Sequence, residues 1–148
     1  MNKYIGFKML QAEPMNLGDY NKFRGWTIPE NENPDTEGYK VVYPDGYVSW
    51  SPKEIFETAY MQVADNNTIT QENVDNFIAH YDYCKMGEKT TVVKATLKNG
   101  FVIIESSSCV DVANYDDEIG ANICKEHIKN KVWELLGFLL QTAKNGIK

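Results

Sequence analysis

The segment from about Asp117 to Thr142 places the strongest constraint on the fold. Its apolar residues recur at steps of three and four positions, which is the spacing of one buried face on a helix. They are Ala121, Cys124, Ile128, Val132, Leu135 and Leu139, and Trp133, Leu136 and Leu140 widen the stripe. Roughly 25 residues make about 40 Å of helix. A two-stranded hairpin of ordinary length cannot cover this helix. Its surplus must pack on a second helix, on the N-terminal module or on another copy of the chain.

Two β-branched runs precede this helix, TTVVKATL at 90–97 and FVIIESSS at 101–108. Lys98, Asn99 and Gly100 join them, and Asn-Gly between such runs predicts a tight β-hairpin. Upstream, Thr70 predicts the N-cap of a helix over residues 71–83, followed by a loop over 84–89. The buried side of that helix would carry Val74, Phe77, Ile78 and Tyr81.

The first 60 residues predict a smaller module. We expect a strand over 3–11, a short helix within 13–23 and a long polar loop over 24–38. A hairpin follows, YKVVY at 39–43 and YVSW at 47–50, turning at Pro44-Asp45-Gly46. Ser51, Pro52 and Glu54 have the spacing of a capping box, which predicts a helix that starts at Ser51. Ile55, Phe56, Ala59 and Tyr60 would line its buried face.

These patterns predict an α+β protein with two small modules. Residues 1–64 form the N-terminal hairpin and helix module, and residues 68–148 form the helix, hairpin and long-helix module. The polar stretch VADNNTIT at 63–70 separates them. Each module is expected to be a β-hairpin or a small antiparallel sheet packed on helix.

Charge and composition exclude several classes of protein. The chain has 148 residues and a net charge of −6, which disfavours binding to nucleic acid or to an anionic membrane surface. No apolar run reaches the roughly 18 residues of a membrane span, and the start MNKYIGFKML lacks the features of a signal peptide. Three cysteines with no framework spacing favour reduced thiols and a cytoplasmic location.

Aromatic residues around the N-terminal hairpin supply the candidate binding residues. Arg24 and Trp26 lie in the long polar loop, and a guanidinium beside an indole can hold a planar or charged partner. Arg, Trp and Tyr are also typical of protein–protein contact sites. Because one face of a two-stranded ribbon stays open, some of the rings of Tyr39, Tyr43, Tyr47 and Trp50 should be exposed. We expect Arg24, Trp26, Tyr47 and Trp50 to bind a partner. The alternative is a Trp that fills the small N-terminal core.

Three other groups of residues are candidates for chemical sites. His80 and Cys84, with Cys124 and His127, could hold zinc, but Cys124 lies on the apolar stripe and no Cys-x-x-Cys pair is present. Cys109 and His127 could act as nucleophile and base, but no third group is evident. The acids Glu105, Asp111, Asp116, Asp117 and Glu118 are better explained by helix capping than by a metal. We therefore expect no catalytic residue, no metal and no cofactor.

The second module carries a resemblance. The run 70–78, "KTTVV", "NGFVIIESSSCVD", "NYDDEIG" and "KVWELLGFLL" resemble a family of small tailed-phage proteins without an assigned activity. The segments "IGFKMLQAEPM", "RGW" and "EGYKVVYPDGYVSWSPKEIFETAY", within 4–60, resemble a second recurrent phage module. The resemblance implies a phage or prophage product in the bacterial cytoplasm.

The resemblance favours a non-enzymatic accessory protein that binds a host protein and counters host defence. One alternative is a protein that sequesters a nucleotide immune signal at a subunit interface, using Lys94, Lys98 or Arg24. Another is a cysteine hydrolase that uses Cys109 and His127. A homodimer through the C-terminal helix is a further expected partner.

Overall fold

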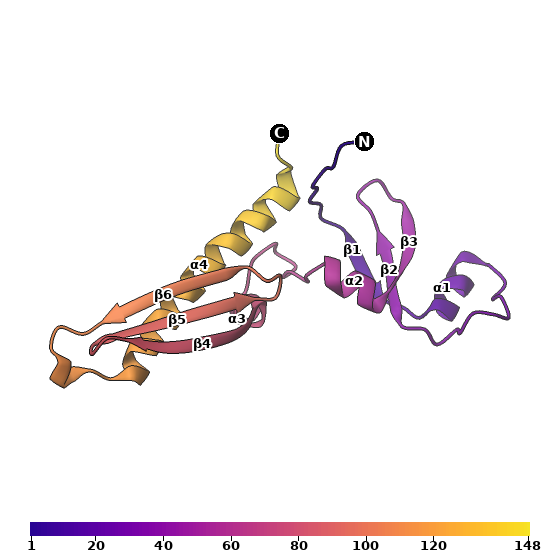
Figure 1. Cartoon of the computed structure of the whole chain (residues 1–148). Coiled ribbons are helices and arrows are strands. Elements are labelled where there is room, and N and C mark those ends of the chain that lie inside the picture. The colour runs from indigo at the N-terminus through magenta and orange to yellow at the C-terminus, as the bar shows by residue number, and fades with distance from the viewer. The chain divides into compact units, whose positions relative to one another are not determined.

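The computed structural model describes all residues from Met1 to Lys148. The chain divides into two compact units, which we call the N-terminal unit (residues 1–62 with 142–148) and the C-terminal unit (residues 63–141). Two three-stranded antiparallel sheets are present, ordered β1-β2-β3 and β4-β5-β6 (Figure 1). Helices accompany both sheets, which confirms the α+β class.

The sheet of the N-terminal unit consists of β1 (Gln11–Pro14), β2 (Gly38–Val42) and β3 (Val48–Pro52). The predicted hairpin is confirmed, and its turn places Gly46 at φ 88°, where a side chain would be strained. The strand predicted over 3–11 is wrong, because residues 1–10 have no regular structure. Gln11 pairs with Val42, the last residue of β2, so the preceding residues have no strand to pair with.

Two short helices complete this part of the unit. Helix α1 (Leu17–Arg24) begins after Asn16, whose side chain accepts a hydrogen bond from the Asp19 amide, and it ends at Gly25 in the left-handed region. Helix α2 (Lys53–Ala59) begins after Pro52, which makes no side-chain capping bond.

The predicted capping box at Ser51 is therefore wrong. Ser51 remains in β3, where it pairs with Tyr39 of β2, so its backbone is committed to the sheet and its hydroxyl does not cap the helix. The expected buried face of α2 is also wrong at Ile55, which is 65% exposed, and at Ala59, which is exposed as well.

The C-terminal unit begins with helix α3 (Gln71–Phe77). The predicted cap is confirmed: the Thr70 hydroxyl accepts from the Asn73 amide at 3.1 Å, and the Asn73 side chain accepts from the Thr70 amide at 3.0 Å. The helix predicted to continue to residue 83 stops at Phe77. Residues Ile78–Met86 form strand β4, which pairs along its length with β5 and obtains its backbone hydrogen bonds there.

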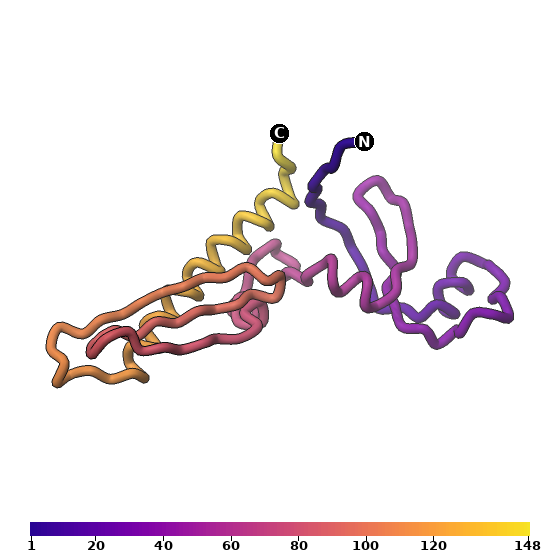
Figure 2. Tube along the Cα trace, in the orientation of Figure 1, coloured from indigo at the N-terminus to yellow at the C-terminus, as the bar shows by residue number.

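The second predicted hairpin is confirmed as β5 (Thr90–Leu97) and β6 (Val102–Ser108), with Gly100 at φ 85° in its turn. A short 3₁₀ helix, η1 (Val112–Asn114), leads to the long helix α4 (Asp117–Asn145). Figure 2 traces the path of the chain from the sheet into this helix.

The core of the C-terminal unit lies between its sheet and α4. The buried face of α4 carries Cys124, Ile128, Val132 and Leu136, and it packs with Val93, Ala95, Leu97 and Ile103 of the sheet. Leu136 takes the buried position expected for Leu135, which is 37% exposed. The sheet has three strands and not two, and it buries Cys124, Ile128, Val132 and Leu136 of α4 within the unit. No helix of the chain combines the length and apolarity that a membrane crossing requires.

Candidate functional site

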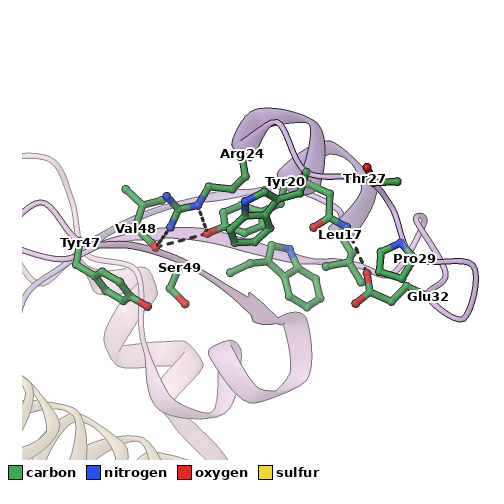
Figure 3. Close-up of a pocket in the computed structure, with 12 residues that line it drawn as sticks. Leu17, Tyr20, Arg24, Thr27, Pro29, Glu32, Tyr47, Val48 and Ser49 are labelled. Carbon is green, nitrogen blue, oxygen red and sulfur yellow. Dashed lines mark hydrogen bonds between the residues drawn. The ribbon is translucent and has the colours of Figure 1, made fainter.

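An open hollow of about 510 Å³ lies on the N-terminal unit (Figure 3). Helix α1, the loop that follows it and the start of β3 form its walls. The four residues expected to bind a partner, Arg24, Trp26, Tyr47 and Trp50, all line this hollow. The structure therefore brings them together, although they are up to 26 positions apart in the sequence.

Arg24 is held in a fixed position in the wall of the hollow. Its Nε donates to the Tyr20 hydroxyl at 2.9 Å, and its Nη2 donates to the Val48 carbonyl at 2.6 Å. The guanidinium carbon lies 5.7 Å from the Tyr20 ring centre and 5.3 Å from that of Trp26. No carboxylate forms an ion pair with it. Arg24 thus joins α1 to β3 and leaves its positive charge without a counter-ion.

Trp26 and Tyr47 present the accessible rings of the hollow. Their side chains are 57% and 61% exposed, respectively. The Trp26 ring meets Tyr20 edge-on, with the ring centres 6.0 Å apart. Large exposed rings next to a positioned guanidinium are typical of a protein contact site.

Trp50 has a structural role beside its place in the wall. Its Nε1 donates to the Met15 carbonyl at 2.7 Å, which ties β3 to the segment after β1. The ring also packs so closely on Gly38 that an added Cβ would lie 2.3 Å from Cζ2. Trp50 is therefore half-buried and tied to its neighbours, whereas Trp26 is exposed and does not fill the small N-terminal core.

The sequence did not point to the other residues that line the hollow, among them Tyr20, Asn21 and Glu32. Tyr20 is 4% exposed, and the buried Asn21 amide donates to the Glu32 carboxylate at 3.3 Å. Arg24 was predicted in the loop but is the last residue of α1, and Tyr20, four positions earlier, shares its helix face. Glu32 belongs to the long loop, and no motif around it indicated a place in the hollow.

The other rings of the hairpin have structural contacts. The Tyr39 ring stacks on Phe56 of α2, with the ring centres 4.3 Å apart, and its hydroxyl donates to Glu57 at 2.8 Å. This hydrogen bond to the Glu57 carboxylate raises the pKa of Tyr39. Tyr39 therefore holds α2 against β2.

The four residues considered as zinc ligands, His80, Cys84, Cys124 and His127, do not form a cluster. His80 and Cys84 lie on strand β4 instead of a helix, and His80 faces Asp82 at 3.7 Å. Cys124 is completely buried on α4, and burial raises the pKa of its thiol. No three His, Cys, Asp or Glu side chains are grouped so that they could hold a metal ion.

Cys109 and His127 do not share a site. Cys109 lines a small hollow of about 90 Å³ between the ends of β5 and β6, the segment 109–116 and the start of α4, and its thiol donates to the Asp111 carbonyl at 3.1 Å. His127 does not line that hollow and instead faces Glu105 at 3.9 Å. The hydrolase pair therefore has no geometric support.

Local contacts account for the acidic residues. The Asp116 side chain accepts from the amides of Glu118 and Ile119 at the start of α4, and Asp111 accepts from the Ala113 amide. Glu105 pairs with Lys131 at 2.5 Å. Lys94 and Lys98 are exposed on the C-terminal unit and do not line the hollow of the N-terminal unit.

Comparison with models of protein families matches residues 69–144 to the phage protein (N4 Gp49/phage Sf6 gene 66) family. The match runs from the cap of α3 to the end of α4 and covers just over half of the chain. It confirms the phage resemblance of the second module, whereas the resemblance of residues 4–60 stays a prediction. Neither the curated proteins nor the solved structures gave a match.

Proposed function

Because this chain belongs to the phage protein (N4 Gp49/phage Sf6 gene 66) family, we propose that it is a non-enzymatic accessory protein that binds a host protein in the bacterial cytoplasm. The observation that carries the proposal is the hollow of the N-terminal unit, where exposed Trp26 and Tyr47 rings flank Arg24. Counter-defence against a bacterial immune system is the setting that we propose for this binding.

The unpaired charge of Arg24 suggests what the partner presents. Arg24 has no carboxylate partner, and its two internal hydrogen bonds fix the guanidinium before any partner arrives. A preorganised guanidinium loses little side-chain entropy on binding. The partner is therefore a protein surface that places an acidic side chain at Arg24 and an apolar side chain against Trp26 and Tyr47.

The test is capture from host lysate followed by reconstitution. Tagged wild-type protein, Trp26→Ala and Tyr47→Ala are compared, and Tyr4→Ala is the matched control. Tyr4 belongs to the same unit and is 90% exposed, but it does not line the hollow. Loss of a ring at the energetic centre of an interface costs about 2 kcal/mol or more of binding free energy.

The captured protein is then purified and titrated by calorimetry. We expect Trp26→Ala to weaken binding about 30-fold or more, whereas Tyr4→Ala binds as the wild type does. Equal affinity of the wild type and both hollow variants would refute this site. A cyclic nucleotide that raises the melting temperature of the wild type, with no captured protein, would favour sequestration of a nucleotide signal instead.

A further inference from the structure

The two edges of the β4-β5-β6 sheet differ in how they are protected. Strand β4 has a register irregularity between Ile78 and His80 and carries Asp82 and Lys85. Bulges and charges are the usual protection of an exposed edge against further pairing. Strand β6, at the other edge (Figure 1), has no proline and no irregularity in its pairing.

The single charged residue of β6, Glu105, does not protect the edge against pairing with another strand. Glu105 is paired with Lys131 of α4 at 2.5 Å, so it lies on the helix side of the sheet. The burial pattern of β5 identifies the opposite, open face of the sheet. Val93 and Ala95 are buried on the helix side, and Lys94 between them is exposed on the open face. Ile104 pairs with Lys94 and therefore lies on that open face.

The free backbone groups of β6 can be identified from its hydrogen bonds. The Leu97 amide donates to the Phe101 carbonyl, which makes that pair a hydrogen-bonded one. Because such pairs alternate along an antiparallel ladder, Ile103 and Glu105 bond to β5, while Val102, Ile104 and Ser106 point their amides and carbonyls away from it. Val102 and Ile104 are also 43% and 59% exposed.

We propose that β6 pairs antiparallel with β6 of a second copy of this chain, with Ile104 at the twofold axis. This register places the two Ile104 side chains opposite each other on the open face, and it joins the outward backbone groups of Val102 to those of Ser106 in the other copy. The interface is isologous, so one edge strand supplies both halves.

Charge complementarity on the helix side favours a second copy as the occupant. In this register Glu105 lies opposite Ile103 of the other copy, and the two Glu105 residues are about 7 Å apart along the strands, by the standard rise per residue. Each Glu105 lies beside two basic residues of the same chain, Lys131 and His127, which are 53% and 52% exposed. Each Glu105 is thus already neutralised by Lys131 of its own chain, so the two carboxylates do not oppose association.

Sedimentation equilibrium in reducing buffer tests this interface. We expect a dimer for the wild type. Ile104→Lys should weaken dimerisation at least about tenfold, because the twofold axis sets two lysines directly opposite each other. Val102→Lys, opposite Ser106, should weaken it less. The matched control is Met86→Lys, which changes a 64% exposed residue at the other edge, on β4, and should leave the dimer intact.

Ile104→Pro separates pairing from side-chain effects. It removes an amide that points away from β5, so the fold should persist, as circular dichroism would show, while dimerisation is lost. A monomeric wild type at every concentration would overturn the proposal. So would a dimer that survives both Ile104 variants, or one that Met86→Lys disrupts equally. The proposal does not depend on the hollow of the N-terminal unit.

Discussion

The two units build similar sheets but stabilise them differently. The C-terminal unit buries a continuous apolar cluster between its three strands and α4. In the N-terminal unit the buried apolar side chains are Tyr20 and Val41, and the longest helix has 8 residues. Directed contacts hold that unit instead, such as the Trp50 bond to Met15 and the Arg24 bond to Val48. Apolar burial is therefore concentrated in the C-terminal unit, whereas the hollow of the N-terminal unit leaves the rings of Trp26 and Tyr47 exposed.

The largest effect is expected in the apolar cluster. Ile128 is fully buried at the centre of the α4 face, so Ile128→Ala should lower the free energy of unfolding by about 2–5 kcal/mol. Ile123, 38% exposed on the same helix, is the control, and its alanine variant should cost under about 1 kcal/mol. Urea unfolding followed by circular dichroism measures both. Equal costs would show that the cluster does not dominate stability.

Two glycines of α4 should change the stability of the C-terminal unit in opposite directions. A Cβ at Gly120 would lie 2.5 Å from Thr91 Oγ1, so Gly120→Ala should destabilise by about 1–3 kcal/mol. No atom lies within 4 Å of a Cβ at Gly137, so Gly137→Ala should stabilise by about 0.5–1 kcal/mol through helix propensity. Thermal unfolding gives both signs, and stabilisation by Gly120→Ala would contradict the close contact of α4 with β5.

The N-terminal unit is tested through its two tryptophans. Trp50→Phe keeps most of the ring but removes the donor to Met15, and it should cost about 1 kcal/mol. Trp26→Phe changes an exposed ring and should cost less than about 0.5 kcal/mol. Chemical denaturation of the two variants under identical conditions gives the difference. A larger loss from Trp26→Phe would reverse the roles assigned to the two rings.

The smallest effect is expected at the Asp75–Lys129 pair, which joins α3 to α4 at 2.9 Å. The hydrogen bond from Lys129 holds the pKa of Asp75 below its ordinary value. A depressed pKa contributes stability above the unfolded-state value of about 3.9, and that stability is lost as the pH falls through the folded-state pKa.

Asp75→Asn should therefore lower the melting temperature slightly at pH 7, and the difference from the wild type should vanish in acid. Melting curves at several pH values measure this difference, and Asp82→Asn on β4 is an exposed control. A difference that grows as the pH falls below 3.9 would contradict the assigned direction.

The sequence predicted correctly the features that depend on neighbouring residues, and it failed where pairing with distant residues decides the structure. Thr70, the Asn99-Gly100 turn and the α4 stripe were predicted correctly, because capping, turn geometry and helical spacing are local. Residues 78–83 were predicted as helix, because Phe77, Ile78 and Tyr81 also fit helical spacing. Pairing with residues of β5 that lie ten or more positions away makes this segment a strand. Ser51 has the sequence of a cap, and its pairing with Tyr39 overrides it.

The candidate site was predictable in its residue types but not in their roles. Arg, Trp and Tyr near a hairpin pointed to the hollow, and all four expected residues line it. The sequence could not show that Trp50 would be tied to Met15 while Trp26 stayed exposed, because that depends on how the loop after α1 meets β3. Glu32 entered the hollow through the same long loop.

The position of α4 in the chain has a consequence during synthesis. Val93, Ala95 and Leu97 leave the ribosome well before the helix that covers them, and Leu136 follows Ser108 by 28 residues. At about 5–20 residues per second, the apolar face of the β4-β5-β6 sheet stays uncovered for at least about 1–6 seconds. During that interval the nascent hairpin is a target for chaperones, and any delay in translating α4 prolongs its exposure.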